Sequence, residues 1–167
     1  LMSCYVIGDH HLGMLAHAAI TGGEDYNINK AESLLVEAFD KLITRGVDSQ
    51  TGLLVNLGDF LHANDTTNTT QSGHVLDVDG HFSRAYESAG ALIRLVVTMM
   101  LKKHEKVIIL NARGNHDRDA ALSLNIMMKV LYENDPRVEV LDNVSKFVSY
   151  KFGSNLIVTH HGDRMTP

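Results

Sequence analysis

Short runs of apolar residues alternate along the chain with longer segments in which apolar residues recur every three or four positions. The short runs predict strands, and the longer segments predict amphipathic helices. The predicted strands are 3–7, 52–57, 106–111, 138–141, 146–152 and 156–159, and the predicted helices are 30–45, 81–103 and 120–133. Because strands that alternate with helices are typical of βαβ units, the pattern predicts an α/β protein.

Boundary signals support two of these assignments. Asn29 is placed to cap the first predicted helix, with Glu32 at its third position and Gly46 directly after its last turn. The segment 153–155, with the sequence Gly-Ser-Asn, separates the last two predicted strands and predicts a hairpin turn.

Polar motifs follow four of the predicted strands. They are Asp9-His10-His11, Gly58-Asp59, Gly114-Asn115-His116-Asp117 and His160-His161-Gly162-Asp163. In open α/β sheets, ligands bind where the carboxyl ends of the strands leave the sheet. Asp, His and Asn side chains without a thiolate suit hard or borderline divalent cations. The sequence therefore predicts a metal site at these strand ends.

Spacing adds detail to this prediction. Asp9 and His11 are two positions apart, so in extended backbone their side chains project the same way and both can bind one ion. Gly58 lets the backbone turn sharply before Asp59. Each residue taken singly is also compatible with a turn or a helix cap, but that interpretation does not explain four such motifs at strand ends.

Histidine is frequent in this chain, with ten residues, and His17 and His104 are interpreted as ordinary surface or capped residues. His62 follows Asp59 by three positions and either lines the site or packs in the polar loop predicted for 61–80. The length of that loop favours a functional role.

Composition limits the class of protein. The net charge is −5 and no basic run is present, which argues against strong non-specific binding to nucleic acid. A nucleotide or nucleic acid substrate is still compatible, because bound metal ions would invert the local field. No apolar run approaches the ~20 residues that span a bilayer, so no membrane partner is expected. A single Cys4 fits a reducing compartment, and a cytoplasmic protein with one domain over residues 1–167 is expected.

In their order along the chain, the four motifs resemble the signature of calcineurin-like metallophosphoesterases: D-x-H, GD, GNH[DE] and a later His. The resemblance runs from Val6 to Asp163. The chain is most similar to phage and prophage members, in a bacterial or phage-infected cell, and the segment 9–13 also resembles DNA repair exonuclease-like phosphoesterases. The resemblance implies two packed β-sheets flanked by helices (an αββα sandwich) and a hydrolase that uses metal-activated water.

The resemblance also implies two divalent metal ions. The implied metal ligands are Asp9, His11, Asp59, Asn115 and His161, with His160 as the alternative to His161. Asp59 would bridge the two ions. A site of nitrogen and oxygen ligands favours Mn²⁺, with Fe or Zn²⁺ as alternatives.

Three residues next to these ligands are candidates for catalysis and substrate binding. His116 is the candidate proton donor for the leaving oxygen, and Asp117 is expected to hold its imidazole. Arg113 is expected to contact substrate phosphate, because guanidinium groups suit phosphate oxygens.

One part of the family signature, G-H-x-H, does not occur before Pro167. In the family this motif supplies one ligand to each metal ion, so the natural chain is expected to continue through it and through the last strands of the fold. The alternative is a protein that ends here and binds metal weakly. The predicted function is a phosphodiesterase or nuclease-like enzyme acting on a nucleic acid or nucleotide. A phosphomonoesterase similar to protein phosphatases and a non-catalytic binding module are the alternatives.

Overall fold

Four parallel strands in the order β1-β2-β3-β4 form the main sheet of the computed structural model, which describes residues 1–70 and 72–163. The strands are β1 (Met2–Ile7), β2 (Thr51–Asn56), β3 (Lys106–Asn111) and β4 (Val138–Val140). They are connected by α2 (Ile28–Arg45), α3 (Phe82–Leu101) and α4 (Arg118–Tyr132), with a short α1 (Ala18–Thr21) ahead of α2. The described chain ends with an antiparallel pair, β5 (Val148–Phe152) and β6 (Asn155–Thr159).

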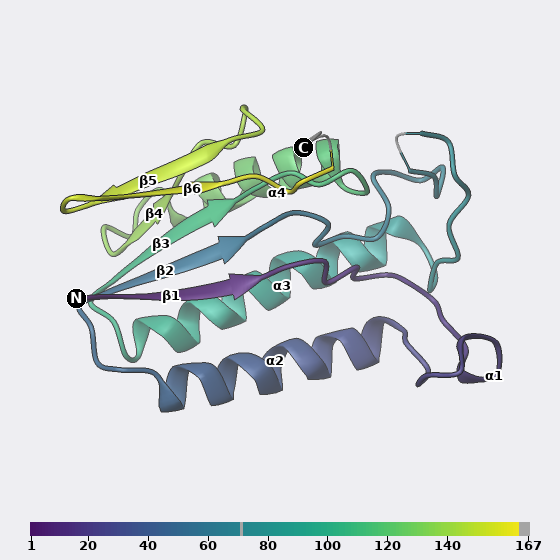
Figure 1. Ribbon diagram of the computed structural model, residues 1–167, viewed down its shortest axis with the longest axis horizontal. Coiled ribbons are helices and arrows are strands. Elements are labelled where there is room, and N and C mark those ends of the chain that lie inside the picture. The colour runs from purple at the N-terminus through teal and green to yellow at the C-terminus, as the bar shows by residue number, and fades with distance from the viewer. Residues whose placement is uncertain (71, 164–167) are drawn as a thin grey trace.

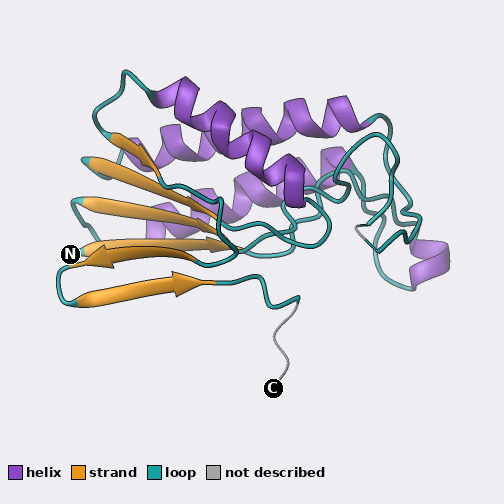
Figure 2. Ribbon diagram, turned by 90° about the horizontal axis from the view of Figure 1, so that it is seen from above, coloured by secondary structure: helices purple, strands orange, loops and turns teal. Residues whose placement is uncertain are grey.

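The elements lie in layers (Figures 1 and 2). Helices α2, α3 and α4 cover one face of the main sheet, and the β5–β6 hairpin lies against the other face. Strand β2 contributes side chains to the hydrophobic core on both faces of the sheet. Leu54 packs among the helices, whereas Leu53 and Val55 contact the residues that pack around Val148 of β5. A strand that is buried on both faces reads as a continuous apolar run, which explains the sequence pattern of β2 and β3.

The structure confirms the α/β class and the alternation of strands and helices. Strand β3 has the predicted bounds, and the pairing of Phe152 with Asn155 leaves a two-residue turn in the predicted hairpin. The predicted start of the first helix is wrong. Asn27, not Asn29, is its N-cap, because the Asn27 side chain accepts a hydrogen bond from the backbone N–H of Lys30. Among the described residues, none of the helices combines the length and the apolar character needed to cross a membrane.

His104 is a correction to the sequence interpretation, because it is only 3% exposed. Its Nδ1 lies 2.8 Å from the carbonyl oxygen of Ser49, which can only accept, so Nδ1 carries the ring proton. Nε2 must then accept the hydrogen bond of 2.9 Å from the Tyr5 hydroxyl. This network ties β1 to the turns that precede β2 and β3.

Replacement of Tyr5 by Phe is expected to lower the free energy of unfolding by about 1–3 kcal/mol, because the buried Nε2 of His104 loses its donor. Denaturant unfolding followed by circular dichroism measures the change. Tyr86→Phe is the matched control, since Tyr86 packs against the same core and its hydroxyl makes no hydrogen bond to another described residue. Equal unfolding energies for Tyr5→Phe and the control would show that the network does not stabilise the fold.

Candidate metal centre

The carboxyl ends of β1, β2 and β3 meet at one edge of the sheet, because Ile7, Asn56 and Asn111 occupy neighbouring register positions. The polar motifs that follow these strands are therefore neighbours in space, although their positions in the sequence are about 50 residues apart (Figure 1). The predicted convergence of strand ends is present in the structure.

Two buried asparagines hold the turns that follow β2 and β3. Asn56 donates a hydrogen bond of 2.6 Å from Nδ2 to Oδ1 of Asn111, and its own Oδ1 accepts from the backbone N–H of Gly58. Asn111 donates in turn to the carbonyl oxygen of Ala121 in α4. A polar residue at the end of each apolar strand thus fixes the direction in which the chain leaves the sheet.

Backbone conformation at the site is unusual. Asp9, His11 and Asp59 have φ values of 50°, 49° and 53°, a region that side chains other than glycine rarely adopt. Such conformations persist where the surrounding structure holds them, and they cluster at functional sites. The expectation that Asp9 and His11 lie in extended backbone is wrong. The two side chains belong to different clusters, Asp9 to a group with Asp59 and His161, and His11 to a group of three imidazoles.

The first cluster contains Asp9, Asp59 and His161, whose ligand atoms all lie within 4.8 Å of one another. His161 Nδ1 lies 3.0 Å from the carbonyl oxygen of Leu57, so Nδ1 donates, and in the neutral form of the ring Nε2 would present its lone pair. That Nε2 is 3.2 Å from Oδ2 of Asp59 and 3.0 Å from Oδ1 of Asn115. Three acceptor atoms therefore converge, and a carbonyl that orients the far nitrogen of a histidine is the usual arrangement around a metal ligand.

His160, the alternative ligand, lies differently. Its Nδ1 accepts a hydrogen bond of 2.8 Å from the backbone N–H of Gly162, and its ring contacts Phe147 with a centroid separation of 4.7 Å. The contacts with Asp59 and Asn115 are made by His161, so the geometry favours His161 as the ligand of the pair.

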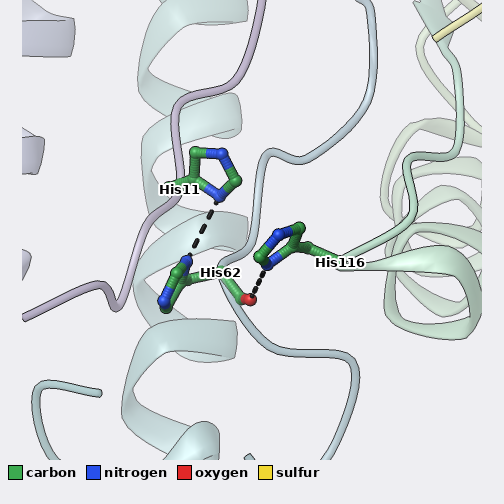
Figure 3. Close-up of side chains that lie close together, drawn as sticks. All are labelled: His11, His62 and His116. Atoms are coloured by element: carbon green, nitrogen blue, oxygen red, sulfur yellow. Dashed lines mark hydrogen bonds between the residues drawn. The ribbon is translucent and has the colours of Figure 1, made fainter. Parts of the chain in front are cut away.

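The second cluster consists of His11, His62 and His116 (Figure 3). The Nδ1 atoms of His11 and His62 are 3.2 Å apart, and His116 Nδ1 lies 2.8 Å from the carbonyl oxygen of His62. Burial, together with the neighbouring imidazoles of His11 and His116, lowers the pKa of His62 to about 4. The sequence left the role of His62 open, and the structure brings it to the site. Its position three residues after Asp59 was the only signal.

Asp117 has a different role from the one expected, because among the described residues its carboxylate makes no hydrogen bond to the His116 ring. It accepts backbone hydrogen bonds from Asp59 and Gly114 on Oδ1 and from Leu61 on Oδ2, at 3.0–3.2 Å. Asp117 is fully buried, and this burial raises the pKa of its carboxyl to about 6 although the three N–H donors favour the charged form. Asp117 therefore joins the turns after β2 and β3, and the carbonyl of His62 orients His116 instead.

Gly114 makes the close approach of these two turns feasible. A Cβ atom at position 114 would overlap the backbone nitrogen and the carboxylate of Asp59. We expect Gly114→Ala to displace Asp59 and to lower the free energy of unfolding by about 1–3 kcal/mol.

The effect of Gly114→Ala is measured by chemical denaturation together with metal uptake. Gly23→Ala is the matched control, because a Cβ at Gly23 has no neighbour closer than 3.9 Å. An alanine at position 114 that leaves both stability and metal uptake at the control level would contradict this account of the turn.

A small basic pocket lies beside the metal ligands. It is lined by Arg113, Gly114, Arg118, Lys146, His160 and Asp163. Arg113 donates from Nη2 to the carbonyl oxygen of Val144, which holds the guanidinium in place, while its buried Nε has no hydrogen-bond partner among the described residues. Arg113 thus lines a pocket beside the site, and its guanidinium group suits an anion.

Fold and site together define an α/β protein with a candidate His/Asp metal centre at the carboxyl edge of a parallel sheet. Comparisons with protein-family models, with curated proteins and with solved structures found no match for this chain. The case for a function therefore depends on the geometry of the site and on the motifs in the sequence.

Proposed function

We propose that this chain is a metal-dependent phosphodiesterase of the calcineurin-like metallophosphoesterase type, with the αββα architecture of that superfamily. The observation that carries the proposal is the convergence of Asp59, Asn115 and His161, with Nε2 of His161 3.2 Å from Oδ2 of Asp59 and 3.0 Å from Oδ1 of Asn115. Such a set is stabilised by a cation. Asp9 lies within the same group of potential ligand atoms.

The donor set fits divalent metal ions. Asp9, Asp59, Asn115 and His161 would hold them together with His11, and oxygen-rich ligands mixed with imidazole favour Mn²⁺, with Fe or Zn²⁺ as alternatives. When bound, the ions would polarise the phosphoryl oxygens and lower the pKa of a water molecule.

His116 is the proton donor in this proposal. Its Nδ1 donates to the carbonyl oxygen of His62 at 2.8 Å, so Nε2 is the atom that would carry the second proton of the imidazolium form and pass it to the leaving oxygen. The backbone N–H of His116 donates to Oδ1 of Asp59 at 2.8 Å, which fixes the proton donor relative to the metal ligands. A positioned imidazole of this kind typically contributes ~10²–10⁴-fold to a rate.

The basic pocket favours a diester over a monoester. The pocket beside Gly114 contains three cationic side chains and one carboxylate, although the chain as a whole has a net charge of −5; these residues are Arg113, Arg118, Lys146 and Asp163. A nucleotide chain offers further phosphates on both sides of the bond that is cut, and local positive charge would bind one of them. A phosphomonoesterase remains the second candidate, supported by the guanidinium group of Arg113 that lines this pocket.

Metal-stripped protein is expected to hydrolyse bis(p-nitrophenyl) phosphate after addition of Mn²⁺, and chelation by EDTA is expected to abolish the activity. Release of p-nitrophenol measures the rate, and metal analysis measures uptake. Faster hydrolysis of p-nitrophenyl phosphate than of the diester would favour the phosphomonoesterase. Absence of metal uptake together with absence of turnover on both esters would refute the proposal.

A further inference from the structure

His11, His62 and His116 form a compact cluster of three imidazoles. One nitrogen from each ring lies within 4.8 Å of a nitrogen from each of the other two, and the three rings come from the segments that follow β1, β2 and β3 (Figure 3). The ring centroids are 4.7 Å apart for His11 and His116, and 5.1 Å apart for His62 and His116. Three imidazoles at this separation are a complete set of protein ligands for one ion.

His116 is already in the tautomer that a metal ligand needs. Because the carbonyl oxygen of His62 can only accept, Nδ1 of His116 carries the proton, and the neutral ring keeps a lone pair on Nε2. A ligating histidine usually donates its other N–H to a carbonyl in the same way.

His11 and His62 face each other through their Nδ1 atoms at 3.2 Å. Two lone pairs cannot face each other at this distance, so one Nδ1 carries a proton and the other accepts it. A metal ion can replace that proton and bind both nitrogens. Zn–N bonds of ~2.0–2.1 Å in tetrahedral geometry separate two ligand nitrogens by ~3.3–3.4 Å, which is close to the separation observed here.

Backbone hydrogen bonds fix the segments that carry His11 and His62 relative to each other. The backbone N–H groups of Leu12 and His62 donate to the carbonyl oxygens of Phe60 and Leu12, at 2.8 and 3.0 Å, so the segments that carry His11 and His62 run side by side. Little rearrangement is needed to form the site, and rigid supports of this kind favour metal affinity.

We propose that His11, His62 and His116 form a separate mononuclear site for Zn²⁺ or another late first-row metal ion. Its ligands are three imidazoles without a carboxylate, and such a set favours Zn²⁺, Co²⁺, Ni²⁺ or Cu²⁺ over Mn²⁺. The cluster of Asp9, Asp59 and His161 is richer in oxygen, so the two clusters would select different ions. The partly exposed rings of His11 and His116 leave the fourth position open to water.

This assignment has a regulatory consequence that depends on the proposed phosphodiesterase activity. An ion in the three-histidine site would occupy Nε2 of His116 and withdraw His11 from the neighbouring ions. Zn²⁺ is therefore expected to inhibit the Mn²⁺-activated enzyme.

Titration of the metal-free protein with Co²⁺ tests the site without any enzymatic assay. Wild-type protein is expected to show the intense visible absorption of four-coordinate Co²⁺, and Zn²⁺ is expected to displace it. His62→Gln should lose this absorption and weaken binding of the first Zn²⁺ by at least ~10–100-fold, the range found for loss of an outer-shell partner alone. Asp59→Asn should keep the absorption. His74→Gln is the matched control, because His74 is exposed in the same polar loop.

Two results would overturn the assignment. Equal Co²⁺ spectra for wild type and His62→Gln would show that the three histidines do not bind the ion, and loss of the spectrum in Asp59→Asn would place the ion in the carboxylate cluster. Circular dichroism verifies the fold of each variant, and His116→Gln replaces His62→Gln if the latter does not fold. Because the readout is spectroscopic, a protein without phosphoesterase activity can still bind Co²⁺ here, so the two proposals fail separately.

Discussion

Replacement of Asp59 by Asn is expected to remove bound Mn²⁺ and phosphoesterase activity together. Asp59 is 3% exposed, one side-chain oxygen accepts from the backbone N–H of His116, and the other lies 3.2 Å from His161 Nε2. An amide keeps the shape but loses the negative charge and one acceptor oxygen, so it could not fill the bridging role proposed for Asp59. We expect Mn²⁺ content to fall below detection and turnover to fall to the background rate.

Metal analysis after gel filtration and steady-state kinetics on the same sample measure this effect. Asp40→Asn provides the matched control. Asp40 is exposed on α2, so this substitution removes the same charge away from the candidate metal centre. A variant at position 59 that retains full metal content and activity would remove Asp59 from the centre and with it the two-ion proposal.

Replacement of His116 by Gln is expected to lower turnover by ~10²–10⁴-fold while Mn²⁺ stays bound in the carboxylate cluster. The reason is that His116 donates Nδ1–H to a backbone carbonyl and leaves Nε2 as the only ring atom that can deliver a proton. The loss should be larger for an oligonucleotide, whose leaving oxygen needs protonation, than for bis(p-nitrophenyl) phosphate, whose leaving group is stable as an anion.

The comparison of the two substrates separates proton donation from a structural role. A structural defect would reduce both rates equally, whereas loss of a proton donor changes their ratio. His74→Gln serves as the control for a generic loss of imidazole. If His116→Gln loses Mn²⁺ as completely as Asp59→Asn does, then His116 holds the catalytic ions and the proton-donor assignment is wrong.

Local patterns were sufficient to predict most elements of secondary structure. The apolar run 106–111 is β3 with the same bounds, and the turn at Gly153 and Ser154 joins β5 to β6 as expected. Where the prediction was off, the cause was also local. Asn27 and Asn29 are both good N-cap residues, and the choice between them depends on which one leaves the chain extended before the helix.

The sequence by itself determined the class of fold, the strand ends that carry polar motifs and the residue types that suit a metal ion, because each of these follows from the order of residues along one segment. Which side chains meet was decided only by the tertiary structure. Asp9 and His11 have positive φ angles and belong to different clusters. The buried carboxylate of Asp117 accepts from three backbone N–H groups. His62 lies beside His11 because a parallel bridge pairs Leu12 with Leu61. These contacts join residues about 50 positions apart and depend on strand register and on turn conformation, which periodicity and motif spacing do not encode.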